Sequence, residues 1–414
     1  MTGALGFVFW TIAARGYTPA EVGRASAIIS SATLLSSLSN LSLGDLYERF
    51  LPVSGRDAAR HIASGRFAIM ALAAVMGVGF VLLGPRESLF DSMIEQILYP
   101  IAVVVLGVFA IQDKTLIGLG RARTVARKNI TQSVAKLALV AAFIPLATGS
   151  AIVWAWVVPA ALIAIWIGFT SVRTSSRAMV GEPNLPPRSE IWHFFAGSLA
   201  MNVVGVFVPL VVPLVIVATL GTEMNAYFSI CWLIISTAII LLYSTAAPFI
   251  SAAAEPGADL RHATIRFIAL CGGAGILSCV GLIIIAPWVL AIMGPSYAEN
   301  GTVLVRLMAL TLPTVSFVAI YTALAKVERR LRFAVGVQVV FGIFVIAGIA
   351  PAAERWGIQG VGYLYLAADL LVVAILLVPG IALIRRALRH PVAPTVADTP
   401  NVVRSSSASS GTWS

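Results

Sequence analysis

Long stretches of this chain contain no charged residue. The longest are Phe67 to Pro85, Ala151 to Val172, Phe194 to Leu220, Ala226 to Ala254, Phe267 to Met293 and Phe333 to Ala353. Each approaches or exceeds the ~20 residues with which a helix crosses a bilayer. The alternating pattern of a membrane barrel is absent, and a lipid-exposed backbone must satisfy its own hydrogen bonds. The sequence therefore predicts an all-α polytopic membrane protein.

Composition supports this class and argues against nucleic acid as a partner. Mean hydropathy is +0.94, and only 11% of the 414 residues are charged, against about a quarter in soluble proteins. The net charge of +10 comes from basic residues in short clusters between apolar runs. Membrane topology explains such clusters better than binding to a nucleic acid does.

The apolar segments predict about twelve transmembrane helices, six on each side of a polar stretch at residues 173–190. We expect a first bundle at residues 1–172, a cytoplasmic linker at 173–190, a second bundle at 191–390 and a disordered tail at 391–414. The first helix, within Met1 to Ala14, covers only ~20 Å. We therefore expect it to be shortened by a chain start placed too far downstream. The second helix is predicted from about Val22 to Tyr47, entered through Pro19.

The distribution of basic residues predicts orientation. Of the 28 Lys and Arg residues, 21 fall in the linker, in the tail or in loops after even-numbered helices. Cytoplasmic loops carry such an excess. We expect a multi-pass protein of the cytoplasmic membrane with both termini in the cytoplasm.

The two halves also resemble each other. One alignment places Val22 beside Ala226, a shift of 204 residues, and another places Leu119 beside Leu324, a shift of 205. Two segments with nearly the same shift indicate a duplicated unit. Because each unit has an even number of helices, the repeats are parallel, and such an architecture places a cavity between them.

A line of small polar residues marks the second helix. Ser26, Ser30, Thr33, Ser37 and Asn40 follow spacings that place them on one helical face. Such a face suits water or a polar ligand. Small hydroxyl residues also let helices pack closely, and the spacing leaves both interpretations open.

Charged residues within apolar segments are the other candidates. Lys136, Arg306 and Asp369 each lie among apolar neighbours, where a charge is costly and usually faces a cavity or a partner. An ion pair of Arg306 with Asp369 is the alternative to a substrate role. Lys136 has no acidic residue in its own helix and is the strongest candidate for holding an anionic group. Arg24 and Asp45 lie nearer the ends of their helix.

No catalytic grouping, nucleotide-binding loop or zinc spacing is visible. The four histidines lie at predicted cytoplasmic ends, and Cys231, Cys271 and Cys279 lie inside apolar runs, where cysteine packs as a small hydrophobe. We therefore expect no enzyme activity, no cofactor and no metal site.

The segments Ala13 to Pro52 (AARGYTPAEVGRASAIISSATLLSSLSNLSLGDLYERFLP) and Ala110 to Asn129 (AIQDKTLIGLGRARTVARKN) resemble polysaccharide flippases of the Wzx type. These belong to the multidrug, oligosaccharidyl-lipid and polysaccharide exporter superfamily. The resemblance implies flipping of an undecaprenyl-pyrophosphate-linked oligosaccharide by alternating access. Its partners would be that lipid-linked oligosaccharide, membrane lipid and other polysaccharide assembly proteins.

The resemblance also assigns roles to the candidate residues. Lys136, Arg306 or Arg24 would hold the diphosphate, Ser30, Thr33, Ser37 and Asn40 would contact sugars, and Asp45 or Asp369 would couple an ion. A multidrug exporter of the same superfamily is the alternative, although it would be expected to carry carboxylates in its cavity. A membrane glycosyltransferase or polymerase would be expected to have a sizeable outer loop, whereas the outer loops here are short.

Overall fold

The computed structural model describes residues 2–40, 42–146, 148–253, 259–328 and 331–389. Every regular element in these ranges is a helix. The predicted tail at 391–414 lies outside the described residues.

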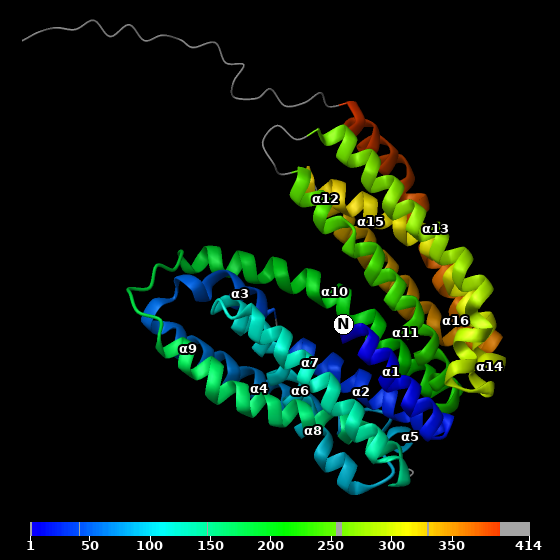
Figure 1. Cartoon of the computed structure of the whole chain (residues 1–414), viewed down its shortest axis with the longest axis horizontal. Coiled ribbons are helices and arrows are strands. Elements are labelled where there is room, and N and C mark those ends of the chain that lie inside the picture. Colours follow the sequence, from blue (N-terminus) through cyan, green and yellow to red (C-terminus); the bar gives the residue numbers. More distant parts are fainter. Residues whose placement is uncertain (1, 41, 147, 254–258, 329–330, 390–414) are drawn as a thin grey trace, which may run out of the picture.

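The first half of the chain forms helices that run back and forth in one bundle (Figure 1). They are α1 (Thr2–Gly16), α2 (Pro19–Ser39), α3 (Leu43–Phe50), α4 (Ala58–Leu83), α5 (Arg86–Leu89), α6 (Met93–Gly118), α7 (Ala122–Ala142), α8 (Gly149–Ile167), a π-helical turn (Gly168–Val172) and α9 (Arg173–Arg177).

The second half begins with a long helix that leads from the first bundle into a second one. Its helices are α10 (Arg188–Leu220), α11 (Thr222–Ser244), α12 (Ala246–Ala253), α13 (Leu260–Met293), α14 (Pro295–Ala309), α15 (Leu312–Val327) and α16 (Leu331–Arg389). Gly357 has a φ of +59°, so α16 is two helices joined at a kink.

The prediction of an all-α polytopic membrane fold is confirmed. In the described ranges, seven helices are long and apolar enough to cross a membrane. The remaining predicted segments correspond to α7, which carries four basic residues, and to shorter or bent helices. Leu5–Gly16 and Phe207–Leu220 are short apolar helices, α2 and α3 form a bent pair, and the kink divides α16.

Helix α2 begins as predicted but ends earlier. Pro19 occupies its first turn, and Thr18 and Glu21 form a reciprocal capping box. The prediction that this helix continues to Tyr47 is wrong, since α2 ends at Ser39 and α3 continues at an angle of 52°. Near the end of α2, side chains compete for backbone carbonyls: Ser39 Oγ and Asn40 Nδ2 both donate to Ser36 O. Such competition weakens the helical hydrogen-bond ladder.

The two bundles diverge from one another (Figure 1). The first bundle, α1 to α9, and the second, α11 to α16, approach at the end where α5 and α14 lie, and separate toward α9 and α12. The molecule is therefore V-shaped.

A close crossing of α2 and α11 joins the bundles. A Cβ added at Gly23 would lie 1.7 Å from Thr222 O, so the two backbones are nearly in contact. Asn225 Nδ2 donates to Gly23 O at 2.7 Å, and the hydroxyls of Ser26 and Ser229 are 2.5 Å apart. The crossing therefore combines close packing with hydrogen bonds between the halves.

At the opposite end, the polar stretch is anchored on the first bundle. Arg56 N donates to Gly181 O at 3.1 Å, and Asn184 N donates to Val53 O at 2.9 Å. Arg49 of α3 lies over the Phe194 ring of α10 at 4.6 Å. The irregular segment is shorter than the sequence suggested, because helix continues through the π-helical turn to Arg177 and resumes at Arg188.

Candidate functional site

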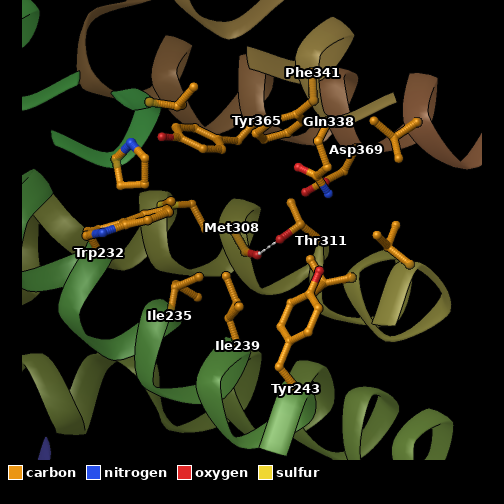
Figure 2. A pocket seen from close by; sticks show the side chains of 15 residues that line it. Trp232, Ile235, Ile239, Tyr243, Met308, Thr311, Gln338, Phe341, Tyr365 and Asp369 are labelled. Carbon is orange, nitrogen blue, oxygen red and sulfur yellow. Dashed lines mark hydrogen bonds between the residues drawn. The ribbon is translucent and has the colours of Figure 1, made fainter. Parts of the chain in front are cut away.

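A cavity of about 170 Å³ lies inside the second bundle (Figure 2). It is lined by Val208, Pro209, Trp232, Ile235, Ile239, Tyr243, Met308, Thr311, Val315, Val318, Gln338, Phe341, Tyr365, Asp369 and Val372. These residues come from α10, α11, α14, α15 and both parts of α16. The cavity is therefore formed by the tertiary packing of the whole bundle rather than by one segment.

Asp369 is the only charged residue among those lining the cavity, and it is 8% exposed. Its side chain lies near those of Thr311 and Gln338 (Figure 2). The hydroxyl of Thr311 donates its proton to Met308 O at 2.7 Å. A hydroxyl has a single proton, so a Thr311 hydroxyl that donates to Met308 O has only lone pairs to offer any other partner.

The rest of the cavity is largely aromatic. Tyr365 lies one helical turn before Asp369, and its ring contacts those of Trp232 and Phe341 with centroids 5.5 and 6.3 Å away. The buried hydroxyl of Tyr365 has no hydrogen-bond partner among the described residues. This hydroxyl lies at the end of the ring that points away from Asp369 (Figure 2), and an unpaired buried hydroxyl marks a place for a water molecule.

Lys136 lies in the first bundle, on α7. Its Nζ is 3.5 Å from the centroid of the Trp156 ring and 5.3 Å from that of Phe9. The side chain is 5% exposed, and no ion pair involves it in the described part of the chain. The ammonium is thus held by aromatic faces of α1 and α8, a cation–π arrangement that partly offsets its desolvation.

The two candidate arginines have other partners. Arg306 Nε donates to Ile283 O at 3.0 Å, and no salt bridge joins Arg306 to Asp369, both of which the structure describes. The alternative of an Arg306–Asp369 ion pair is therefore wrong, because Asp369 faces the interior cavity whereas Arg306 is exposed. Arg24 forms a salt bridge with Asp91.

The polar residues of α2 are divided between packing and internal hydrogen bonds. Ser26 lies at the crossing with α11, and Thr33 Oγ1 donates to Ile29 O at 2.7 Å. Asn40 bonds to Ser36 O, while Ser30 and Ser37 are half-buried. None of these residues lines the cavity around Asp369.

Asp45 lies on α3 and takes part in a charged cluster. Lys114 Nζ is 3.7 Å from Asp45 Oδ1 and 2.9 Å from Glu48 Oε2. Asp45 and Asp369 are thus placed very differently, one in a partly exposed ion pair and the other in a buried cavity. The geometry favours Asp369 of the two as an ion-coupling candidate.

Lys128 is one of the basic residues that were predicted to lie in loops, in this case the loop after the fourth predicted helix, and that prediction is wrong. It lies on α7 with 1% exposure, and its Nζ is 2.6 Å from Asp113 Oδ1 and 2.5 Å from Phe109 O. Asp113 and Lys128 are both visible in the sequence, but only the packing of α6 against α7 brings them together. Thr311, Gln338 and Tyr365 were missed for the same reason.

No protein-family model matches the chain, and no curated protein matches it. Several solved structures do match the chain. A multidrug resistance MATE family transporter of the MOP superfamily, in its inward-facing conformation, is 15% identical, with 93% of this chain and 94% of that chain covered and a TM-score of 0.64. The outward-facing conformation of a MATE family transporter gives 15% identity, 94% and 92% coverage, and a TM-score of 0.55.

The lipid II flippase MurJ, in an inward closed conformation, is 12% identical, with 94% of this chain and 88% of that chain covered and a TM-score of 0.67. Identity at this level shows the fold alone. The chain therefore has the twelve-helix fold of MOP-superfamily transporters.

Proposed function

We propose that this protein is an alternating-access transporter that flips a lipid-linked oligosaccharide, of the undecaprenyl-pyrophosphate type, across the cytoplasmic membrane. Binding of a proton or a monovalent cation at Asp369 drives its conformational cycle. Both termini and residues 173–190 face the cytoplasm in this proposal.

The observation that carries the proposal is the V shape. The bundles meet where α2 crosses α11 and separate toward α9 and α12. Arg49, Arg66 and Arg173 lie toward the separated ends, and the basic side of a membrane protein faces the cytoplasm. The gap then opens inward. The higher TM-score with the inward-facing MATE structure, 0.64 against 0.55, supports this assignment.

Size separates the ion site from the substrate site. A volume of about 170 Å³ is below the ~300–1,000 Å³ typical of small-molecule pockets. This volume has room for several waters and a cation but not for an oligosaccharide. In this proposal the substrate therefore occupies the space between the bundles, and the cavity of the second bundle controls its opening.

Lys136 is the proposed contact for the diphosphate. A buried ammonium without an ion-pair partner needs a compensating anion at some stage of the cycle, and a diphosphate forms charge-assisted hydrogen bonds with lysine. In the present state Phe9 and Trp156 cover the ammonium. The proposal therefore requires α1 to move when substrate binds. The sequence resemblance to Wzx-type flippases and the shared fold with MurJ favour such a substrate.

A multidrug exporter is the second candidate, because one observation favours it. Asp369 is a carboxyl group in a cavity with Trp232, Tyr243, Phe341 and Tyr365, and aromatic rings with an acid suit an organic cation. The small volume of the cavity weighs against it in this state.

Transport in proteoliposomes tests both functions. Purified protein is reconstituted with a lipid-linked oligosaccharide labelled on its sugar, and protection of the sugar from an external glycosidase is followed with and without an imposed proton or sodium gradient. Flipping stimulated by a gradient, and lost in Asp369→Asn, supports the proposal. Efflux of an organic cation without flipping would favour the exporter, and activity of neither kind contradicts both functions.

A further inference from the structure

A large groove lies on the outside of the first bundle, and the proposed transport mechanism does not use it. Its volume is about 630 Å³. The residues lining it are Ala59, Ile62, Ala63, Arg66, Met70, Val104, Val105, Val108, Gln112, Ala161, Ala164, Ile165, Gly168, Phe169, Val172, Arg173, Ser176 and Arg177. All belong to α4, α6, α8, the π-helical turn or α9, which lie on the side away from α11 to α16 (Figure 1).

The groove is apolar along most of its length and basic at one end. Arg66, Arg173 and Arg177 line that end, and all three are exposed. No acidic residue lines the groove, and no salt bridge involves these arginines in the described ranges. From Arg177 back to Ala161 the helix covers ~24 Å at 1.5 Å per residue, more than half of a ~30 Å hydrocarbon core.

A buried polar group marks the boundary between the two parts. Gln112 is 4% exposed, and its Nε2 donates to Ala164 O at 2.7 Å. Its Oε1 has no hydrogen-bond partner among the described residues. A Cβ added at Gly168 would lie 3.5 Å from Gln112 Nε2 and 3.9 Å from an Arg66 guanidinium nitrogen, so these polar groups surround one small region.

The helix wall of the groove is irregular at the same place. The amide of Gln112 engages Ala164 O, and Gly168 N bonds to both Ala164 O and Ile165 O. The π-helical turn Gly168–Val172 follows at once. A side chain inserted into the helical ladder accounts for such a turn, and π-turns are frequent at functional sites.

We propose that this groove binds an anionic phospholipid of the phosphatidylglycerol class. The lipid phosphate lies among Arg66, Arg173 and Arg177, and an acyl chain follows the apolar residues toward Val104. Guanidinium groups bind phosphate through charge-assisted hydrogen bonds. Basic pockets between membrane helices on the cytoplasmic side bind anionic lipid head groups.

Charge selects among lipids. The only charged residues that line the groove are arginines, so it favours an anionic phospholipid over a zwitterionic one such as phosphatidylcholine. The groove also lies away from the gap between the bundles, where the transported lipid is proposed to bind.

Native mass spectrometry of the delipidated full-length protein, titrated with phosphatidylglycerol or phosphatidylcholine, tests the inference. We expect one phosphatidylglycerol to bind preferentially. Arg173→Ala with Arg177→Ala should weaken its binding about 25-fold, at roughly fivefold for each arginine near a membrane surface. The matched control, Arg385→Ala with Arg386→Ala, removes the same charge from exposed positions of α16 and should change binding by less than about twofold.

Gly168→Leu tests the groove without altering charge, since its side chain would enter the space beside Gln112 and Arg66. Gly168→Leu should reduce phosphatidylglycerol binding, whereas the control with Arg385→Ala and Arg386→Ala should retain that binding. Equal binding of phosphatidylcholine, or equal loss in the control pair, would overturn the proposal. Preferential displacement of phosphatidylglycerol by undecaprenyl phosphate would also overturn it, since the groove would then belong to the transported lipid. Thermal unfolding of each variant separates loss of binding from loss of fold.

Discussion

The two bundles share an architecture but carry opposite chemistry. The first bundle has a buried lysine, Lys136, packed against aromatic rings, and a basic groove on its outer face. The second bundle encloses an acid, Asp369, in a small interior cavity. The repeat shift of 205 residues places Lys136 opposite Phe341, which lines the acid cavity. Corresponding positions of the two halves therefore carry different polar groups, as expected when function resides in sites carried by a fold.

Gly23→Ala gives the largest expected effect. It tests whether the bundles are joined at the crossing of α2 and α11. The new Cβ would meet the Thr222 backbone at 1.7 Å, and no rotamer change relieves contact with a backbone. We expect a loss of about 3 kcal/mol or more in stability, seen as a lower melting temperature. Gly273→Ala is the control, since nothing lies within 4 Å of its added Cβ. Equal melting temperatures for the two variants would contradict the close crossing.

Lys136→Ala tests the basic side of the comparison. Loss of a charge-assisted contact with the diphosphate should reduce flipping about 10- to 100-fold, with normal membrane insertion, and Lys136→Arg should retain part of the activity. Lys114→Ala serves as a control because it removes a basic residue of α6 that is paired with Glu48. Wild-type flipping by Lys136→Ala would assign the lysine to packing alone.

Tyr365→Phe tests the acidic side with a smaller change. The hydroxyl is buried without a described partner, and removing an unsatisfied polar group from an interior stabilises by about 1 kcal/mol. The variant should therefore melt at a higher temperature than the wild-type protein. A lower melting temperature would show that the hydroxyl has a structural partner.

Arg49→Ala should have the smallest effect. Its guanidinium lies over Phe194 and 3.4 Å from Glu190, with both charged side chains about half exposed. Exposed pairs contribute about 1 kcal/mol or less. We expect nearly unchanged stability. The cross-linking between cysteines placed on α3 and α10 should change at a faster rate during transport. A large loss of stability would mean that the first bundle depends on this contact.

The sequence predicted what is encoded locally. Charge-free runs predicted the membrane helices, Pro19 with Thr18 predicted the start of α2, and Asp369 was found because a carboxylate stands out in an apolar segment. The early end of α2 was not predicted, because an apolar run conceals competition by serine and asparagine side chains for backbone carbonyls.

The surroundings of the candidate site could not be read from the sequence. Thr311, Gln338 and Asp369 come from separate segments, and their neighbourhood depends on how α15 packs against both parts of α16. Lys128 was assigned to a loop by its basic neighbours, yet it is buried beside Asp113. Charge identifies candidate residues, but only packing decides whether each meets a partner, a cavity or solvent.

The crossing at Gly23 also sets a mechanical scale for the molecule. From Gly23 to Ser39, α2 extends ~24 Å as a rigid rod. If the crossing serves as a pivot, α2 is a lever arm, and a rotation of roughly 10° moves its far end by about 4 Å. Because the side chain of residue 23 is a single hydrogen, the backbones of α2 and α11 approach closely at this point. Rotation about such a point requires the least sliding of neighbouring side chains. With the crossing as a pivot, a small rotation at one end of the molecule would therefore produce a displacement of several ångströms at the other.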